Sequence, residues 1–345
     1  MTPELAALIQ IRGLEVAFAR HRRDSEQPST LLAVDGVNLD IYPGETLCVV
    51  GESGSGKTTT ARAIGALVAP TAGSVQIDGV GVSTLRGRRL KEFRRRVQFV
   101  FQDPFESLNP RQRVREIVAE PLIVHRLAGN KKEVAARVIE SLEECGLSPG
   151  EQFAGRYPHE LSGGQRQRVS IAAATILGPK LLIADEPVSM LDVSVRAGII
   201  QLLLKLRQAH QMALMFVTHD LSLAWAIGDR VAVMYAGRLL EIGTPEQVIT
   251  APAHPYTSAL VSAIPEADPD LPLRPMNLVS DSVTVASREA CCFRLRCPYA
   301  KPECASERPP LKDVGSEHQS ACLRYLEIRG ELPKMELRPL ASDKR

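Results

Sequence analysis

The segment GESGSGKT, residues 51–58, has the glycine spacing and the lysine of a phosphate-binding loop, G-x-x-x-x-G-K-[ST]. The strand-like segment TLCVV precedes it, and it opens the helix-like segment TTTARAIGAL, as such a loop requires. Glycines let backbone N–H groups approach phosphate oxygens closely, and the helix N-terminus adds partial positive charge. Lys57 can then bind the outer phosphates of a nucleotide, while Thr58 can coordinate Mg²⁺. The loop residues expected to bind the nucleotide are Gly51, Glu52, Ser53, Gly54, Ser55, Gly56, Lys57, Thr58 and Thr59.

The apolar segment LLIADE, residues 181–186, ends in two carboxylates that supply the chemistry a nucleotide site still needs. Asp185 can hold Mg²⁺ through water, because bound Mg²⁺ keeps several water ligands and uses few carboxylates. Glu186 follows at the carboxyl end of the predicted strand, where open α/β sheets place their ligands. There it can polarise an attacking water molecule as a general base. The phosphate loop and this acidic strand end together indicate hydrolysis of a nucleoside triphosphate.

A parallel sheet is the structure expected to position these groups. Apolar and β-branched segments alternate with helix-like ones, which favours a mostly parallel sheet covered by helices. The turn Tyr42-Pro43-Gly44 separates two strands within 31–51. Further strands are predicted at 7–19, 97–102, 180–186, 213–220 and 230–237, a short strand and turn at 73–80, and a helix at 57–68. A mostly helical insert, with helical periodicity at 111–147, interrupts the sheet at about 105–165.

The composition narrows the class of protein. A chain of 345 residues suggests about two domains, and 44% hydrophobic with 24% charged residues is typical of a soluble globular protein. The net charge of +2 gives no electrostatic reason to expect nucleic acid as a partner. No apolar segment reaches the ~18 residues that a membrane span needs, and MTPELAALIQIRG is not typical of a signal peptide. We therefore expect a cytosolic protein whose thiols stay reduced.

The segment ELSGGQRQRVSIA, residues 160–172, contains LSGGQ, which resembles the signature motif of ABC-transporter ATPases. Other motifs of that family occur in the expected order along residues 7–250. Gln102 resembles the Q-loop glutamine, Asp192 in SMLD the D-loop aspartate, and His219 in VTHD the switch histidine. The resemblance implies an α/β P-loop NTPase with a RecA-like core, an antiparallel β subdomain and a helical subdomain.

The resemblance also implies a role for each of these residues. Phe18 stands where the family has an aromatic residue that stacks on adenine. Glu186, His219 and Gln102 are expected to be catalytic, and Thr58, Gln102 and Asp185 to bind the Mg²⁺ that accompanies ATP. The signature segment would start a helix with free N–H groups, forming an anion site that closes on the nucleotide of a second ATPase subunit. It consists of Leu161, Ser162, Gly163, Gly164 and Gln165, and Asp192 belongs to the same nucleotide-binding set.

Three further segments resemble one branch of the family, the ATPase subunits of oligopeptide and dipeptide importers. They are 102–114, 184–197 and 233–265, and HPYT at 254–257 is the most particular part. The implied function is ATP-driven import of peptides, and a related branch handles nickel. ABC ATPases also act without a transporter in DNA repair, chromosome folding and translation. Those proteins usually have long coiled coils or tandem nucleotide domains, and neither is visible in this sequence.

The same resemblance implies the partners of the chain. An importer ATPase of this branch forms a heterodimer with a second ABC ATPase and docks on two transmembrane permease subunits. An extracytoplasmic solute-binding protein supplies the substrate. The expected location is therefore the cytoplasmic face of the inner membrane, as a peripheral subunit, and no nucleic-acid partner is expected.

Four of the seven cysteines, Cys291, Cys297, Cys304 and Cys322, lie near the C-terminus with spacings x₅, x₆ and x₁₇. Four thiolates in a segment with too little apolar residue to fold alone can hold a metal ion or a cluster. Zinc, free thiols and a disulfide are alternatives, although the C-x₂-C spacing of zinc knuckles is absent. The pattern resembles the C-terminal extension of the peptide-importer ATPases, which implies a [4Fe–4S] cluster with four cysteine ligands.

The other cysteines have different predicted roles. Cys292 does not keep the x₅ spacing, so Cys291 is the expected ligand of the adjacent pair. Cys48 and Cys145 are expected to be small core residues. Residues 1–250 are predicted to form the nucleotide-binding domain, with its helical subdomain at about 105–165. Residues 251–345 are predicted to form a small Cys-rich extension of the peptide-importer type.

Overall fold

The computed structural model describes residues 6–20, 29–264, 278–279 and 287–333. The parts of the predicted extension at 265–277, 280–286 and 334–345 lie outside the described residues. The chain forms two compact units. The first unit comprises Met1–Val16, Leu39–Thr46 and Thr58–Val217. The second unit comprises Ala17–Asn38, Leu47–Lys57 and Thr218–Arg345.

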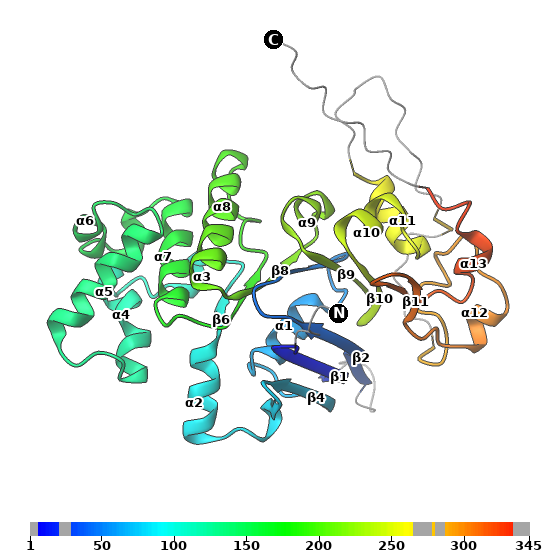
Figure 1. Cartoon of the computed structure of the whole chain (residues 1–345), viewed down its shortest axis with the longest axis horizontal. Coiled ribbons are helices and arrows are strands. Elements are labelled where there is room, and N and C mark those ends of the chain that lie inside the picture. The colour runs from blue at the N-terminus through cyan, green and yellow to red at the C-terminus, as the bar shows by residue number, and fades with distance from the viewer. Residues whose placement is uncertain (1–5, 21–28, 265–277, 280–286, 334–345) are drawn as a thin grey trace, which may run out of the picture. The chain divides into compact units, whose positions relative to one another are not determined.

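The first unit contains a parallel sheet of β6 (Val97–Val100), β7 (Leu181–Asp185) and β8 (Ala213–Thr218), of which Figure 1 labels β6 and β8. β7 pairs with β6 at Val97↔Leu181 and with β8 at Leu181↔Ala213. All residues of β7 and β8 are buried, as in strands that are covered on both faces. These three strands were predicted, and their parallel pairing places their carboxyl ends at one edge of the sheet.

The first unit also contains antiparallel strands. β1 (Ile9–Arg20) pairs with β4 (Ala72–Ile77), and β4 pairs with β5 (Val80–Gly81). The register puts Ile9 opposite Ile77 and Ile11 opposite Val75, and all four side chains are buried. The strands predicted at 7–19 and 73–80 are confirmed.

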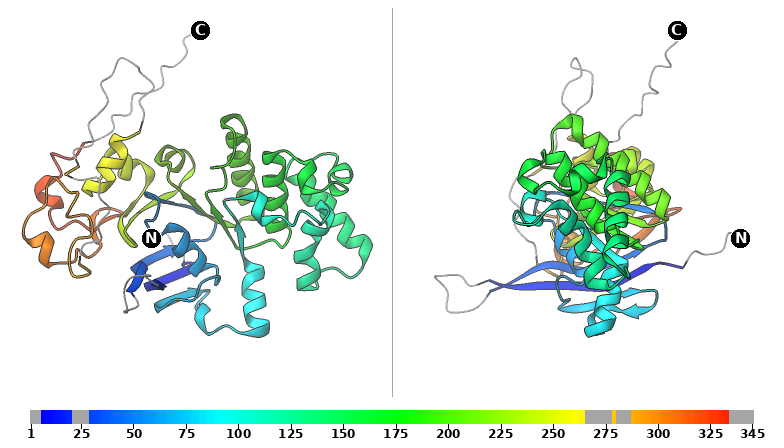
Figure 2. Two further views of the ribbon diagram at one scale, coloured as in Figure 1. Left: turned by 180° about the vertical axis from the view of Figure 1, so that it is seen from behind. Right: turned by 90° about the vertical axis from the view of Figure 1, so that its left-hand side faces the viewer.

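Helices occupy the chain between β6 and β7. They are α3 (Pro104–Ser107), α4 (Val114–His125), α5 (Lys131–Glu144), α6 (Gly150–Ala154) and α7 (Gly163–Thr175), with a 3₁₀ turn at Pro158–Glu160. Every residue at 102–176 is described and none is in a strand, so this segment is helical as predicted. α4 packs on α5, α6 and α7, and both views of Figure 2 keep these helices grouped.

Three further helices complete the described part of the first unit. They are α1 (Lys57–Ile64), α2 (Gly87–Arg96) and α8 (Val193–His210), with a 3₁₀ turn at Val82–Thr84. α1 begins at Lys57, as predicted, and ends four residues before position 68, because a turn begins at Gly65. α2 contains the basic sequence GRRLKEFRRR, of which Phe93 is buried.

The second unit contains β3 (Thr46–Val50) parallel to β9 (Arg230–Tyr235), with Leu47 opposite Arg230. β2 (Ser29–Ile41) precedes β3, and the predicted turn at Tyr42-Pro43-Gly44 separates them. The single strand predicted at 230–237 is wrong at its end. Ala236 and Gly237 have φ angles of 47° and 80° and form a tight turn into β10 (Arg238–Gly243), antiparallel to β9.

The C-terminal part of the second unit is built onto β10. β12 (His318–Ser320) pairs with β10, and β11 (Lys312–Gly315) pairs with β12. The helices are α9 (Leu221–Ile227), α10 (Pro245–Thr250), α11 (Pro255–Ser262), α12 (Glu303–Ser306) and α13 (Tyr325–Ile328). Among the described helices of both units, none combines the length and the apolarity needed to cross a membrane.

Candidate functional site

The phosphate loop of the second unit lies between the buried strand β3 and the start of α1. Gly51 has a φ angle of 150° and Gly56 one of 96°, which are conformations that favour glycine. A Cβ atom on Gly51 would lie 2.1 Å from the carbonyl oxygen of Met234. A Cβ atom on Gly56 would lie 2.5 Å from that of Ala33. Neither position has space for a side chain, so the loop can wrap this tightly only with glycine at both.

Lys57 is folded back onto this loop. Its Nζ donates to the carbonyl oxygens of Gly51 at 2.8 Å and Glu52 at 2.9 Å, and lies 3.4 Å from Ser55 Oγ. The side chain is buried, so a full positive charge is held beside the N–H groups that begin α1. This arrangement can bind the phosphates of a nucleotide.

In the first unit, Thr58 and Asp185 meet as a pair of oxygen ligands. Thr58 Oγ1 donates to Asp185 Oδ1 at 2.9 Å. Asp185 is the last residue of β7 and is buried. Mg²⁺ is commonly bound by one or two protein carboxylates or hydroxyls together with water and substrate phosphates. The two residues therefore fit a Mg²⁺ site that a phosphate would complete.

Glu186 and Gln102 also lie together in the first unit. Gln102 Nε2 donates to Glu186 Oε2 at 3.3 Å, which joins the segment after β6 to the residue after β7. Glu186 has a φ angle of 45°, a left-handed conformation that is uncommon for a residue with a Cβ atom and is found at functional sites. Its backbone N–H donates to the carbonyl oxygen of Val217 at 3.0 Å. Backbone geometry thus orients the carboxylate, as the role of a general base requires.

The signature segment forms the beginning of α7. Ser162 is the N-cap residue: its Oγ accepts from the Gln165 backbone N–H at 3.3 Å, and Gln165 Oε1 accepts from the Ser162 N–H at 3.0 Å. The predicted helix start is confirmed. A Cβ atom on Gly164 would lie 2.5 Å from Val195 Cγ1, so this position packs against the start of α8. Leu161 is buried, whereas Ser162 is exposed at the positive end of the helix.

The remaining predicted site residues occupy separate positions. His219 follows β8 and is exposed, and it precedes Asp220, whose side chain caps α9. Phe18 is 43% exposed on β1. Asp192 is exposed at the N-cap position of α8 and makes no side-chain capping bond there. The catalytic role assigned to His219 and the nucleotide-binding roles assigned to Phe18 and Asp192 stay predictions.

Two residues that contact the phosphate loop, Arg296 and Tyr256, were not predicted from the sequence. The Glu52 carboxylate accepts two bonds from Arg296 Nη1, at 3.0 and 2.9 Å, and the Glu52 backbone N–H donates to the Tyr256 hydroxyl at 2.9 Å. Tyr256 belongs to the HPYT segment, which the sequence singled out without a structural reason. No local pattern could have revealed either contact, because they join residues 204 and 244 positions apart.

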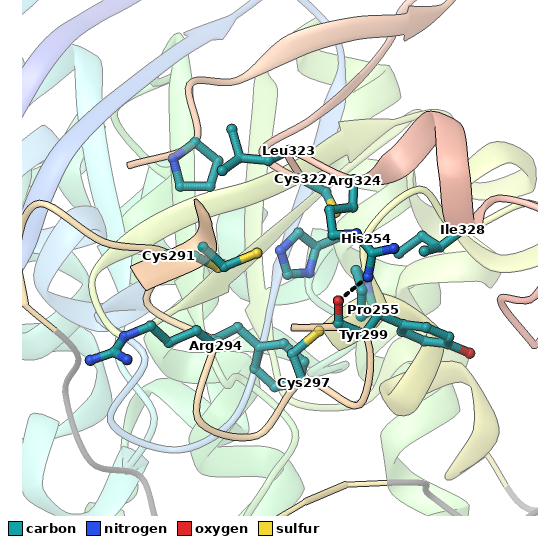
Figure 3. A pocket seen from close by; sticks show the side chains of 13 residues that line it. His254, Pro255, Cys291, Arg294, Cys297, Tyr299, Cys322, Leu323, Arg324 and Ile328 are labelled. Carbon is teal, nitrogen blue, oxygen red and sulfur yellow. Dashed lines mark hydrogen bonds between the residues drawn. The ribbon is translucent and has the colours of Figure 1, made fainter. Parts of the chain in front are cut away.

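Cys291, Cys297, Cys304 and Cys322 line one small hollow in the second unit, and Figure 3 labels Cys291, Cys297 and Cys322 there. The Cys291 backbone N–H donates to the Cys304 carbonyl oxygen at 3.0 Å. Cys292 is not among the lining residues, and its thiol instead lies 3.9 Å from the carbonyl oxygen of Tyr235. Cys48 and Cys145, as predicted, are buried in the core.

The thiols of the hollow influence one another. Burial, together with the smaller effect of the neighbouring Cys291 and Cys304 sulfurs, raises the pKa of Cys297 to about 11 and that of Cys322 to about 12. Thiolates that repel one another in this way are stabilised by a bound cation. Four cysteine sulfurs around one hollow are the kind of ligands that an iron–sulfur cluster uses.

A site for a single metal ion has less support. Across the described residues, no three His, Cys, Asp or Glu side chains form a group that could hold a metal ion. Four thiolates around one zinc ion would lie about 3.8 Å apart, given a Zn–S distance of about 2.3 Å and tetrahedral geometry. The ligands of a [4Fe–4S] cluster each bind a different iron atom, so this finding weighs against zinc more than against a cluster, which stays a prediction.

Comparison with known families gives two matches along the chain. Residues 34–189 match the family described as ABC transporter, and residues 240–304 match the family described as oligopeptide/dipeptide transporter, C-terminal region. The second match includes the HPYT segment and three of the four cysteines of the hollow.

Relatives and solved structures resemble the chain over most of their own lengths. The oligopeptide transport ATP-binding protein OppF of Salmonella typhimurium is 46% identical, covering 92% of this chain and 96% of that protein. A putative peptide import ATP-binding protein of Brucella ovis is 44% identical, covering 92% and 98%. The dimeric ATP-binding cassette MJ0796, bound to ADP and Pi, has a TM-score of 0.61 and 34% identity over 69% of this chain and 98% of that chain. Its likeness identifies the fold as that of an ABC ATPase, with mixed α/β sheets.

Proposed function

This chain belongs to the family of ATP-binding subunits of peptide-importing ABC transporters, and from this premise we propose that it hydrolyses ATP to power the import of di- and oligopeptides. The observation that carries the proposal is the 46% identity to an oligopeptide transport ATP-binding protein over 96% of its length. That identity extends through the C-terminal region typical of peptide transporters. The nickel alternative and the transporter-free ATPases have no comparable support.

We assign the chemistry to residues as follows. Lys57 and the loop N–H groups bind the β- and γ-phosphates, and Thr58, Asp185 and Gln102 hold Mg²⁺, which supplies charge neutralisation to the phosphates. Phe18 stacks on adenine. The contacts of Thr58 with Asp185 and of Gln102 with Glu186 support this assignment.

Hydrolysis requires a water molecule in line with the terminal phosphate and a base to take its proton. Glu186 is the proposed base, and Gln102 and His219 orient Glu186 and the γ-phosphate. The exposed start of α7, capped by Ser162, is proposed to bind the nucleotide held by a second ATPase subunit, with Asp192 at the same subunit contact. Charge on the transferred phosphoryl group would then be stabilised from both subunits.

The partners are also proposed. A second ABC ATPase, different in sequence, completes the dimer, and two transmembrane permease subunits carry the peptide across the cytoplasmic membrane. An extracytoplasmic binding protein delivers the peptide. This places the chain at the cytoplasmic face of the membrane as a peripheral subunit.

The division of the chain is proposed from the family resemblance. Residues 1–250 act as the nucleotide-binding domain, and 251–345 form the C-terminal extension. A [4Fe–4S] cluster would stabilise this extension, because its helices α12 and α13 have only four residues each. Its ligands would be Cys291, Cys297, Cys304 and Cys322. The four cysteines around one hollow support the proposal.

Co-expression with candidate permease and ATPase subunits tests the assembly. The proposal predicts that an affinity tag on this chain recovers two membrane subunits and a second ATPase, and that ATP turnover rises when peptide-loaded binding protein is added. Recovery of the chain alone, with turnover that ignores the binding protein, would argue for a transporter-free ATPase.

A further inference from the structure

We propose that Arg296, outside the recognised nucleotide motifs, is a positioning residue for the phosphate loop because it neutralises and orients Glu52. The inference rests on the proposed function, since it takes this loop to bind ATP. In this role, Arg296 links the phosphate loop to the Cys-containing segment, residues 287–333, which then helps to prepare the loop for a polyanionic ligand.

The contact between the two residues is close and sheltered. Arg296 Nη1 lies 3.0 Å from Glu52 Oε1 and 2.9 Å from Oε2, and the Arg296 side chain is only 7% exposed. The guanidinium also lies 5.7 Å from the ring centre of Tyr235 and 5.8 Å from that of Phe293. Aromatic walls and low exposure restrict the arginine to this position, so its charge is directed at one carboxylate.

Glu52 occupies the centre of a small network within the second unit. Its carbonyl oxygen accepts from Lys57 Nζ at 2.9 Å, its N–H donates to the Tyr256 hydroxyl, and its carboxylate receives Arg296. Tyr256 is buried, and burial raises the pKa of its hydroxyl, which therefore stays neutral and available as an acceptor. The residue that helps to place the phosphate lysine is thus held by two C-terminal segments.

Electrostatics explains why the arginine is needed. A carboxylate in a loop that must receive several phosphate charges repels the ligand unless a cation offsets it. Glu52 is five residues before Lys57, and an uncompensated Glu52 would also compete with the phosphates for that ammonium. Arg296 offsets the carboxylate from a sheltered position, where screening by salt is weak.

The backbone around Arg296 fixes its direction. The N–H groups of Arg296 and Cys297 both donate to the carbonyl oxygen of Phe293, at 3.0 and 3.1 Å. One turn therefore sets the position of the arginine and of the adjacent cysteine that lines the hollow. Phe293 packs edge-on against Tyr235, with ring centres 5.4 Å apart, which anchors that turn to β9.

The test compares charge variants in the assembled transporter by steady-state ATP hydrolysis and by binding of a fluorescent ATP analogue. We expect Arg296→Gln to raise KM for ATP and the Kd of the analogue by about tenfold, with kcat changed by less than about twofold, because the loss acts on binding. Arg296→Lys keeps the charge but loses the guanidinium plane that lies against the Tyr235 and Phe293 rings, so a smaller rise is expected. Adding Glu52→Gln to Arg296→Gln should recover most of the lost affinity. Lys301→Gln, which removes an equal charge from the exposed pair with Glu327, should leave KM unchanged.

The outcomes separate this inference from the proposed function. A wild-type chain that hydrolyses no ATP in its complex would overturn the proposed function. A hydrolysing wild type together with an unchanged KM in Arg296→Gln would overturn only the role of Arg296. A double variant as impaired as Arg296→Gln would also overturn it, since the arginine would then act by packing. Should Arg296→Gln fail to fold, Arg296→Lys and the double variant decide. Charge compensation predicts a KM near that of the wild type in the double variant and only a small rise in Arg296→Lys. A rise of about tenfold in either variant would overturn the role of Arg296.

Discussion

The acidic strand end of the first unit and the Cys-containing segment at 287–333 of the second unit are held by different forces. Asp185 ends the buried strand β7, which pairs with β6 through residues 181–184 and with β8 along its whole length, and Glu186 follows it directly. The segment at 287–333 has only short elements, and in addition to its buried apolar residues it is held by ion pairs that converge on one buried carboxylate. Asp35 pairs with Arg288 and Arg308 of this segment, each at 3.0 Å, and with Arg238 of β10 at 2.8 Å.

The difference shows two ways of placing functional side chains. Hydrophobic burial and backbone pairing fix the two carboxylates at the end of β7, so a change of one carboxylate there should alter the proposed chemistry without loss of folding. Ion pairs and hydrogen bonds fix the Cys-containing segment, so a change of one charge there should alter structure first. Variants of the two regions can test this contrast.

Glu186→Gln should lower ATP turnover by about 10²- to 10⁴-fold, because the amide cannot take a proton from water. Nucleotide binding and thermal stability should stay close to wild type, since the backbone bond of residue 186 to Val217 is kept. Turnover of radiolabelled ATP and a thermal melt check both expectations. Glu151→Gln, an exposed change on α6, is the matched control and should leave turnover unchanged. A Glu186→Gln chain with wild-type turnover would show that the base lies elsewhere.

Asp35→Asn should lower the free energy of unfolding of the second unit by about 3–5 kcal/mol, because Arg238 would be left buried without its counter-charge. Burial opposes ionisation of Asp35, but the hydrogen bonds and charges of Arg238 and Arg308 outweigh it and lower its pKa. Urea unfolding and proteolysis at 287–333 measure the effect. Asp40→Asn on the same strand breaks an exposed pair with Arg12 and should cost at most about 1 kcal/mol. Equal losses in the two variants would contradict the role of buried charge.

Cys291→Ser should reduce the iron bound by anaerobically purified protein, with loss of its visible absorbance, whereas Cys292→Ser should keep both. The reason is that the Cys291 thiol lines the hollow and the Cys292 thiol faces a backbone carbonyl. Metal analysis of the two variants side by side makes the comparison. Iron-free, zinc-containing wild-type protein would reject the cluster, and equal iron loss in both variants would reject the ligand assignment.

Acid should destabilise the second unit through His254. Burial lowers the pKa of this histidine to about 3, whereas an unfolded histidine titrates near about 6.5. Below about pH 6.5 the unfolded state binds a proton that the folded state does not, so the free energy of unfolding falls as pH falls toward 3. The slope approaches about 1.4 kcal/mol per pH unit.

Denaturant unfolding at pH 7, 6 and 5 measures this slope. In His254→Asn the asparagine can still cap α11, and the free energy of unfolding should vary less with pH. His210→Asn removes an exposed pair with Glu144 and should keep the share of the pH dependence of unfolding that His254 contributes. The same slope in wild type and His254→Asn would contradict the assignment.

Much of the fold and of the motif chemistry could be predicted from the sequence, because the signals are local. The buried strand before Asp185, the loop glycines and the Ser162 cap each depend on residues within a few positions of one another. The turn at Ala236 and Gly237 was missed, since the apolar run continues through it into β10.

The contacts of the C-terminal segment could not be predicted for a different reason. Arg296 reaches Glu52 across 244 positions, and Arg308 reaches Asp35 across 273. Arginine and carboxylate residues are common in the chain, so no spacing indicates which of them pair. The pairing depends on how β10, β12 and the turns around Phe293 come together, which only the folded chain reveals.

The most direct test of the central claim is uptake of labelled peptide by proteoliposomes that contain the complete transporter with this chain. The account predicts peptide uptake that requires ATP, Mg²⁺ and peptide-loaded binding protein, and that is lost with Glu186→Gln. Uptake of nickel without uptake of peptide, or ATP hydrolysis without uptake of any peptide, would contradict it.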